Sequence, residues 1–338
     1  MALKVGISGY GLSGRYFHAP LLRGAGFNVS AIVTSNTERT HYAHQDFPNA
    51  KIFSSIEAML SEELDLVVIA SANSAHVEQG IEVIKAGIPV VVDKPMGRNY
   101  TETKNLIEFA NTRGVPITTY FNRRWDSDAL TIARLIKEET LGDLFRLDSR
   151  FERFRPVMTT AGWRDSVNPD AGGGLLLDLQ PHLISTAIGW FGAGTVKSAT
   201  IKSIRGGVVD DCVLHIAHDN GVDSFLSASA IAGAPGPRIR LLGSKGALVI
   251  NELDPQEALL RAGKFPEGGS WQEDTSSRAF IHTGNQVEEI VSEQGNYASF
   301  YTAVGVAIRE NSRMPVSTTD ALHVAQLIDD ARTLCADA

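Results

Sequence analysis

The stretch SGYGLSGRYFHAP, residues 8–20, decides the fold of the first part of the chain. Its glycines have the G-x-G-x-x-G spacing of a dinucleotide-binding turn, and they directly follow the apolar run at 3–8. In such a turn the first glycine permits the tight bend, the second lets a pyrophosphate approach the backbone, and the third packs the next helix against the strand. The alternative is an ordinary strand–helix turn. The sequence therefore predicts an anion site at a helix start, lined by Gly9, Tyr10, Gly11, Leu12, Ser13 and Gly14.

Outward from this turn, strand-like and helical runs alternate through the first third of the chain. Apolar, β-branched runs lie at 28–34, 65–70, 89–93 and 116–121, and helical patterns lie between them at 37–47, 75–87 and 100–114. Strands that alternate with helices of this length predict right-handed βαβ units and a parallel sheet. The continuous apolar runs predict that both faces of this sheet are covered. We therefore expect a doubly wound α/β domain of the Rossmann type over residues 1–121.

The alternation of strand-like and helical runs ends after Phe121, which predicts a second domain over residues 122–338. A helical segment at 128–140 and a strand at 144–154 precede a glycine-rich turn with a helix. Strand-like runs then follow one another near 196–204, 209–218, 222–231 and 237–250, with no helix between them. Such a succession predicts an antiparallel or mixed sheet in an α+β domain. Two helical patterns, 297–311 and 318–334, close the chain, and the last helix is placed to pack back toward the first domain.

Composition limits the classes of partner. The chain has 338 residues, 43% apolar and 21% charged, with a net charge of −8 and no run of Lys and Arg. This balance argues against nucleic acid or an anionic membrane as partner and favours a small polar molecule. Cys212 and Cys335 lie far apart without Cys or His companions, so we expect neither a disulfide nor a metal site. The chain shows no signal peptide and no long apolar run, which favours the cytoplasm.

The end of the second predicted strand indicates which dinucleotide binds. An NAD-binding domain usually has an Asp or Glu there, which holds the ribose hydroxyls. This chain reads VTSNTERT at 33–40, and no carboxylate precedes Glu38. Ser35, Asn36 and Arg39 can accommodate a 2′-phosphate, so the sequence favours NADP over NAD. The alternative for Arg39 is an exposed helix position.

Polar residues also follow the strand at 65–70. Ser71, Asn73 and His76 are expected at the carboxyl edge of the sheet, where open α/β sheets bind their ligands. Asn73 and Ser74 can equally be N-caps of the following helix. His76 can equally be a packed helix histidine. We expect contacts from Ser71, Asn73 and His76 to the cofactor and keep these alternatives open.

Two further segments bear chemistry. VVVDKPMG at 90–97 places Lys94 at the same edge, where its ammonium can hydrogen-bond a substrate hydroxyl; the alternative is a surface lysine. NPDAGGGLLLDLQPHLIS at 168–185 places Asp178 and His182 four residues apart, so that the carboxylate can orient an imidazole suited to acid–base work. Pro181 is tolerated only near a helix start, so we expect that helix to begin close to Asp178. The alternative is a structural pair.

Taken together and in this order, these motifs resemble the Gfo/Idh/MocA family of oxidoreductases over essentially the whole chain. The resemblance implies a Rossmann domain joined to a C-terminal α+β domain with a large, open, mostly antiparallel sheet. It implies that Lys94, Asp178 and His182 form the catalytic group and that Asn122 and Arg123 approach the nicotinamide or substrate. Many relatives have Asp where this chain has Ser185, a departure expected to affect substrate contacts or packing.

Within that family, segments such as GYGLSGRYFHAPLL at 9–22 and RFERFRP at 150–156 are similar to the branch of bacterial NADP-dependent scyllo-inositol dehydrogenases. The expected reaction is oxidation of a secondary alcohol on a cyclic polyol or sugar. His182 would accept the proton while Lys94 holds the oxygen and Asp178 orients the imidazole, or Lys94 would be the base. Arg155, Trp163 and Arg164 are expected to contact the cofactor or substrate; the alternative is that they only shape the loop.

Three alternatives remain open at this point. The same fold can reduce a keto-sugar or oxidise an aldose at C1. The family also contains non-catalytic sensing regulators, but the retained Lys94, Asp178 and His182 argue against that alternative.

Strand-like runs at 212–219 and 224–232 carry apolar residues on both faces. We therefore expect a homodimer or homotetramer formed through the C-terminal sheet.

Overall fold

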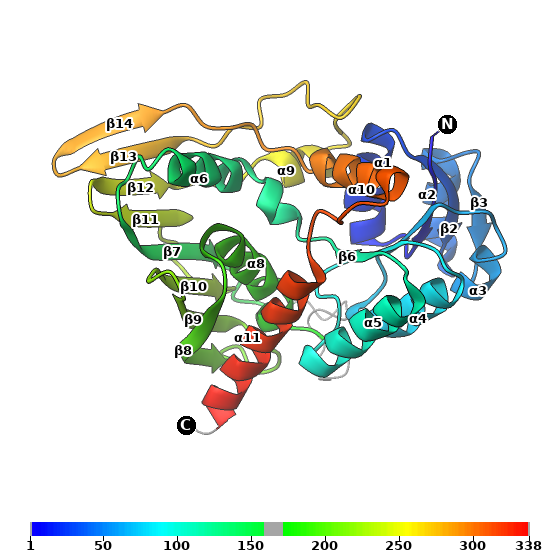
Figure 1. The fold of residues 1–338 in the computed structure, drawn as a ribbon, viewed down its shortest axis with the longest axis horizontal. Coiled ribbons are helices and arrows are strands. Elements are labelled where there is room, and N and C mark those ends of the chain that lie inside the picture. Colours follow the sequence, from blue (N-terminus) through cyan, green and yellow to red (C-terminus); the bar gives the residue numbers. More distant parts are fainter. Residues whose placement is uncertain (1, 159–171, 337–338) are drawn as a thin grey trace. The chain divides into compact units, whose positions relative to one another are not determined.

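The computed structural model describes residues 2–158 and 172–336, and its chain divides into two units (Figure 1). The first unit comprises Met1–Phe121, Gln256–Asp274 and Asn296–Leu322. The second comprises Asn122–Pro255, Thr275–Gly295 and His323–Ala338. Each unit is thus assembled from segments that are distant in the sequence.

The first unit is built on a parallel sheet. Within the described residues its strand order is β3-β2-β1-β4-β5-β6, and every neighbouring pair is parallel. The strands are β1 Lys4–Ser8, β2 Asn28–Val33, β3 Lys51–Phe53, β4 Leu66–Ile69, β5 Val90–Val92 and β6 Ile117–Thr119. All residues of β4 and β5 are buried, as the apolar runs predict for a sheet covered on both faces. The doubly wound Rossmann fold is confirmed.

The order of the strands fixes where a ligand can bind. From β1 the chain first adds β2 and β3 on one side and then β4, β5 and β6 on the other. Open α/β sheets bind ligands at the carboxyl ends of the strands where such a reversal occurs, which is between β1 and β4 in this sheet. The glycine turn leaves β1 at this point.

Most helices of the first unit connect these strands, and α9 and α10 belong to its two C-terminal segments. A π-helical turn, η1 Gly14–His18, leads into α1, and the 3-10 turn η2 Asn73–Ala75 precedes α4. The α-helices are α1 Ala19–Gly24, α2 Thr37–Asp46, α3 Ile56–Met59, α4 His76–Lys85, α5 Tyr100–Arg113, α9 Gln256–Arg261 and α10 Ala298–Glu310. Polar N-caps start several of them; Asn99, for example, accepts from the backbone of Glu102 in α5.

The second unit is built on a mixed sheet. Its strand order within the described residues is β14-β13-β12-β11-β7-β10-β9-β8; β7 and β10 are parallel, and the other neighbours are antiparallel. The strands are β7 Leu144–Glu152, β8 Gly194–Lys202, β9 Asp211–His218, β10 Asp223–Ser229, β11 Ile239–Gly243, β12 Gly246–Ile250, β13 Ala279–Thr283 and β14 Gln286–Ile290. The expected large, mostly antiparallel sheet is confirmed.

The run at 237–250 forms two strands, β11 and β12, which meet at the turn that GSKG at 243–246 indicates. One part of this sheet differs from the sequence prediction. The hairpin of β13 and β14 was not predicted, since β14 is exposed along most of its length and lacks an apolar face.

Helices accompany the mixed sheet (Figure 1). They are α6 Ser127–Lys137, α7 Leu175–Asp178, α8 Gln180–Phe191 and α11 Thr318–Ala336, with a 3-10 turn, η3 Asn122–Trp125. The first residues of α11 group with the first unit and the rest with the second. Gln180, at the start of α8, is fully buried and donates to the carbonyls of Cys212 and Leu226, which fixes this end of the helix on β9 and β10.

Along residues 2–158 and 172–336, no helix combines the length and apolar character that a membrane span requires.

Candidate active site

The glycine turn has the close approaches that its motif predicts. Gly9 has φ +99°, and a Cβ there would lie 2.7 Å from the carbonyl oxygen of Ala70. A Cβ on Gly14 would lie 1.9 Å from the carbonyl oxygen of Gly9. A side chain at Gly9 would therefore displace the turn from the end of β4, and one at Gly14 would push the start of η1 away from Gly9.

Arg39 lies against the same turn. A Cβ built on Gly11 would lie 3.5 Å from Nη1 of Arg39, so the guanidinium covers this glycine although the residue is exposed. Asn36 is the N-cap of α2, since its Oδ1 accepts from the Arg39 backbone N–H at 3.0 Å. The neighbouring Glu38 accepts from the hydroxyl of Tyr42 at 2.7 Å. With Ser35 also exposed, the end of β2 presents a cation and hydrogen-bonding groups.

The side chains of the turn differ in what they offer a ligand. Tyr10 is 1% exposed and donates its hydroxyl to Asp46, so its side chain packs inward and only its backbone faces outward. Leu12 is 38% exposed. Ser13 donates its hydroxyl to Oδ2 of Asp93 at 2.5 Å. This last contact joins the glycine turn to the end of β5.

Lys94 follows β5 directly and is held by its neighbours. Oδ1 of Asp93 accepts from the Lys94 backbone N–H at 2.8 Å. Lys94 is half-buried between the buried residues Asp93 and Pro95, so it is not a fully exposed surface lysine. Burial alone would raise the pKa of Asp93, but the contacts with His18, the charge of Lys94 and the Ser13 hydroxyl together lower it well below its usual range. Asp93 is therefore an anion at neutral pH.

The residues after β4 make contacts within the first unit. His76 is fully buried, with Nδ1 2.8 Å from the carbonyl oxygen of Pro95 and Nε2 3.2 Å from that of Ser71. Burial lowers its pKa, so the ring is neutral and joins the ends of β4 and β5. These contacts are those of the packed-histidine alternative, and a contact of His76 with the cofactor stays a prediction. Ser71 is half-buried and donates to Gln79 at 2.9 Å, and Asn73 is buried in η2. The N-cap of α4 is Ala75, so Asn73 does not cap it.

The second unit places Asp178 and His182 on two successive helices. Asp178 ends α7, and α8 begins at Gln180 after a break at Leu179, whose φ is −108°. A helix does begin close to Asp178, as Pro181 predicts, since Pro181 lies in the first turn of α8. The expectation that one helix carries both Asp178 and His182 is corrected, because Asp178 belongs to α7. Asp178 is half-buried and His182 is 8% exposed.

Aromatic and cationic side chains surround His182. Its ring packs edge-on against Phe151 with centroids 6.3 Å apart. The guanidiniums of Arg238 and Arg123 lie 4.0 Å and 5.4 Å from the centroid of the same phenyl ring. Arg123 is 9% exposed, and its Nη1 lies 3.4 Å from Asp126, so it has little surface for a ligand. Asn122, which precedes it in η3, is also buried.

The remaining predicted residues divide between loop and core. Arg155 is exposed, and its carbonyl accepts from Arg205 at 2.9 Å. Trp163 and Arg164 lie outside the described residues. Ser185, the departure from the family pattern, is 1% exposed and accepts from Nε of Arg124 at 2.9 Å, which is a packing role.

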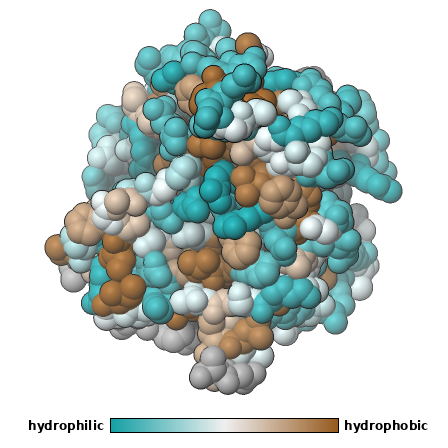
Figure 2. All heavy atoms as spheres, turned by 90° about the vertical axis from the view of Figure 1, so that its left-hand side faces the viewer, coloured by the Kyte–Doolittle hydropathy of each residue, from teal (hydrophilic) through white to brown (hydrophobic). Residues whose placement is uncertain are grey.

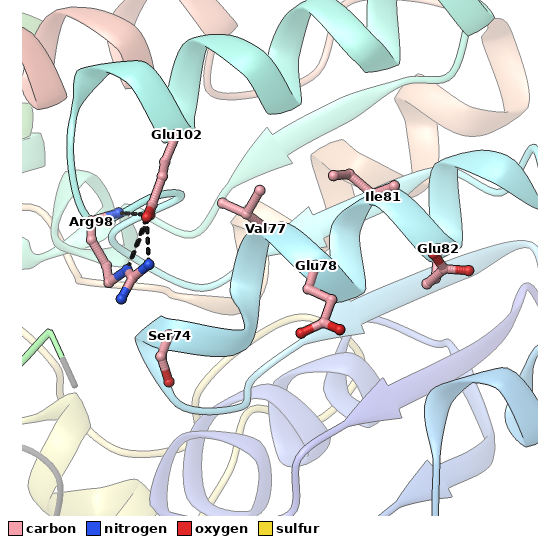
Figure 3. A pocket seen from close by; sticks show the side chains of 7 residues that line it. All are labelled: Ser74, Val77, Glu78, Ile81, Glu82, Arg98 and Glu102. Atoms are coloured by element: carbon pink, nitrogen blue, oxygen red, sulfur yellow. Dashed lines mark hydrogen bonds and ion pairs between the residues drawn. The ribbon is translucent and has the colours of Figure 1, made fainter. Parts of the chain in front are cut away.

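An open groove lies elsewhere on the first unit, along α4 and α5 (Figure 3). It has a volume of about 390 Å³ and is lined by Ser74, Val77, Glu78, Ile81, Glu82, Arg98 and Glu102. Figure 3 shows Arg98 turned toward Glu102, with which it forms an ion pair of 2.6 Å. The other two glutamates leave the groove negative, so it is unsuited to a pyrophosphate.

The structure thus brings the glycine turn, Arg39 and the Asp93–Lys94 segment together in the first unit, and groups Arg123 and His182 about Phe151 in the second. Sequence reasoning missed two buried residues that contact this first group, His18 and Tyr301. The histidine within RYFHAP was a visible signal, but its partner lies 283 positions away.

Comparison with known families gives matches over both parts of the chain. An oxidoreductase family with an NAD-binding Rossmann fold, Gfo/Idh/MocA, matches residues 3–121, and the C-terminal α/β domain of the same family matches residues 133–335. Among residues 2–158 and 172–336 no cluster of three potential metal ligands occurs.

Individual proteins and structures show the same likeness. The chain is 33% identical to the Bacillus subtilis scyllo-inositol 2-dehydrogenase (NADP(+)) IolW, over 97% of this chain and 92% of that protein. It is 31% identical to the Escherichia coli oxidoreductase YdgJ, over 97% and 94%. The solved structure of the oxidoreductase yvaA from Bacillus subtilis superposes with a TM-score of 0.90 at 31% identity, covering 100% of this chain and 97% of that one.

Proposed function

The chain belongs to the Gfo/Idh/MocA family of oxidoreductases, and from this premise we propose that it is an NADP-dependent dehydrogenase that oxidises a secondary alcohol of a cyclic polyol or sugar. The family gives the oxidoreductase class and the nucleotide-binding fold. The choice of NADP and the roles of individual residues rest on the side chains, and the substrate class rests on the relatives.

The turn after β1 fits a dinucleotide. Gly9 and Gly14 leave no room for side chains, and Gly11 is open except for the guanidinium of Arg39. The backbone of residues 9–14 would hold the pyrophosphate, and Arg39 with Ser35 would hold a 2′-phosphate. Since no carboxylate stands at the end of β2 before Glu38, this donor set favours NADP.

The observation that carries the proposal is the link between this turn and Lys94. Asp93 accepts from Ser13 in the turn with one oxygen and from the Lys94 backbone with the other. Lys94 therefore stands beside the place where the cofactor would bind. A half-buried lysine at that position can donate from Nζ to the hydroxyl oxygen of a substrate.

The proposed chemistry assigns a role to each of the predicted side chains. When bound, NADP supplies the hydride acceptor. Lys94 holds the reacting oxygen and stabilises negative charge that develops on it. The imidazole of His182 accepts the hydroxyl proton, and Asp178 keeps that ring oriented and stabilises its cationic form. Asn122 would contribute to holding the nicotinamide end, and Arg155, Trp163 and Arg164 are proposed as further contacts of the cofactor or substrate.

The substrate class is proposed from the relatives. The scyllo-inositol dehydrogenase IolW matches nearly the whole chain, and IolU, named for the same reaction, is 24% identical over 68% of it. A net charge of −8 and the retained Lys94 and His182 suit a neutral polyol. Hydroxyl stereochemistry is read by a few hydrogen bonds, so related inositols should differ strongly in rate.

The experiment is a substrate screen with purified protein. Formation of reduced nicotinamide is followed with NADP or NAD against scyllo-inositol, myo-inositol, glucose and other aldoses. We expect turnover of an inositol with NADP, lost in Lys94→Ala and retained in Lys85→Ala, which removes an exposed lysine paired with Glu82 on α4. If no polyol or sugar is turned over while NADP still binds, the protein is a sensor rather than a dehydrogenase and the proposal fails.

We also propose that the chain assembles as a homodimer or homotetramer through the mixed sheet. Val213 on β9 and Val287 on β14 are 37% and 58% exposed. Figure 2, which faces the side where this sheet lies in Figure 1, shows apolar patches interrupting the polar surface. Sedimentation at micromolar concentration should give a species larger than the 36.5 kDa chain, and a monomer would exclude this proposal.

A reducing compartment, the cytoplasm, is proposed from the cysteines. Cys212 and Cys335 are both free thiols, and Cys212 is buried. Such thiols are typical of proteins that are kept reduced.

A further inference from the structure

A row of buried polar side chains runs from α10 to the segment that carries Lys94. Oη of Tyr301 lies 2.5 Å from Nδ1 of His18, and Nε2 of His18 lies 3.5 Å from Oδ2 of Asp93. Tyr301 and His18 are fully buried and Asp93 nearly so. Nε2 of His18 makes no hydrogen bond with a described residue, so its contact with the Asp93 carboxylate is electrostatic. A buried polar atom is costly in apolar surroundings, and the carboxylate of Asp93 reduces that cost.

Tyr301 meets His18 as a neutral phenol. Burial, with the charges of Tyr120 and Asp93, raises the pKa of Tyr301 well above the ordinary value, so the phenol keeps its proton. The hydroxyl can donate to Nδ1 of His18 or accept from it, so the hydrogen bond forms with either tautomer of the imidazole. This contact holds the ring with Nε2 toward the carboxylate of Asp93.

The aromatic surroundings hold this arrangement in place. The ring of His18 packs against Tyr120 with centroids 4.5 Å apart. Tyr120 stacks with Tyr301 at 5.8 Å and meets Phe300 edge-on at 5.1 Å. A close-packed cluster of this kind leaves His18 few alternative positions.

Asp93 passes the constraint on to two functional segments. Its Oδ2, which faces His18, also accepts from Ser13 in the glycine turn, and its Oδ1 accepts from the Lys94 backbone. The position of one carboxylate therefore sets both the cofactor-binding turn and the lysine that follows it.

We propose that Tyr301 and His18 are positioning residues, which orient Asp93 so that the glycine turn and Lys94 keep a fixed relation to each other. The inference rests on the proposed function for the role of Lys94 in turnover, but its structural part does not. It assigns a task to α10, which lies far along the chain from the nucleotide-binding strands.

The structural part is tested by hydrogen exchange in the absence of any substrate. Tyr301→Phe removes the hydroxyl and keeps the ring. The control is Thr118→Val, which removes another buried hydroxyl of the same unit, one that donates to the carbonyl of Val316 at 2.9 Å. In Tyr301→Phe, peptides covering residues 9–18 and 90–98 should exchange about fivefold faster than in Thr118→Val, the factor expected for one net hydrogen bond. Equal exchange of these peptides in the two variants would overturn the inference.

The kinetic part is a double-mutant cycle. If Tyr301 acts through Asp93, Tyr301→Phe should lower kcat about tenfold in the wild-type background, as loss of outer-shell partners often does, and change the KM for substrate little. In the Asp93→Asn background the same change should lower kcat no further. Additive losses would show that Tyr301 is only a packing residue. If the wild-type protein turns over nothing, the proposed function fails, and the exchange experiment still decides the inference.

Discussion

The preference for NADP depends on Arg39, and its removal gives a sharp prediction. The guanidinium is exposed and lies 3.5 Å from the place where a Cβ on Gly11 would stand, which puts it at the turn that would hold the dinucleotide. A hydrogen bond to a charged group contributes about 1.5–3 kcal/mol. Arg39→Ala should therefore lower kcat/KM for NADP by roughly 10- to 150-fold, since 1.4 kcal/mol corresponds to a factor of ten.

The same change should leave kcat/KM for NAD nearly unaltered, because NAD has no 2′-phosphate. Steady-state kinetics with each coenzyme at saturating polyol provide the assay. The matched control is Arg113→Ala, which removes an arginine from the last turn of α5, where it lies over Phe109. Equal losses with NADP and NAD, or no loss with NADP, would refute the assignment of Arg39 to the 2′-phosphate.

Three further predictions follow from burial and close contact. Burial lowers the pKa of His76, so the folded protein binds a proton on this imidazole less readily than the unfolded chain does. The contribution of neutral His76 to the free energy of unfolding is therefore present above about pH 6.5 and lost as the pH falls below that value. Denaturant unfolding from pH 8 to 5.5 should show a weaker pH dependence in His76→Gln. Burial raises the pKa of Cys212 to about 12, so a thiol reagent should label Cys335 alone in the folded protein and both cysteines in denaturant. Gly14→Ala would bring a Cβ to 1.9 Å from the carbonyl oxygen of Gly9, so the turn must shift. The Kd for NADP, measured by fluorescence titration, should therefore rise about 100-fold. An unchanged Kd would mean that the turn does not bind the pyrophosphate.

The parallel sheet could be predicted from the sequence because its signals are local. Each buried strand is a short apolar run, and β4 and β5 are buried throughout. The mixed sheet gave weaker signals. β14 has four exposed residues among five, so no apolar face indicates a strand there. β11 and β12 are separated only by Ser244 and Lys245, so their apolar residues form one nearly continuous run.

The candidate site could be predicted only as far as its motifs reach. Gly9, Gly14 and Lys94 belong to contiguous patterns, and the structure gives a physical reason for each. Contacts made across the chain could not be predicted in this way. The pairing of His18 with Tyr301 spans 283 positions, and no periodicity reports it.

His76 shows that sequence position alone does not give the surroundings of a histidine at a sheet edge. A histidine after β4 is well placed for a ligand, but its side chain is fully buried and both ring nitrogens face backbone carbonyls. Sequence position alone cannot distinguish the two outcomes, because they differ in the direction of one side chain.

The most direct test of the central claim is the transfer of label from substrate to coenzyme. The protein is incubated with NADP and scyllo-inositol deuterated at its ring carbons, and the NADPH formed is examined by mass spectrometry. The account predicts one deuterium in each NADPH from the wild-type protein and no NADPH from Lys94→Ala. NADPH without deuterium, or equal label from Lys94→Ala, would contradict it.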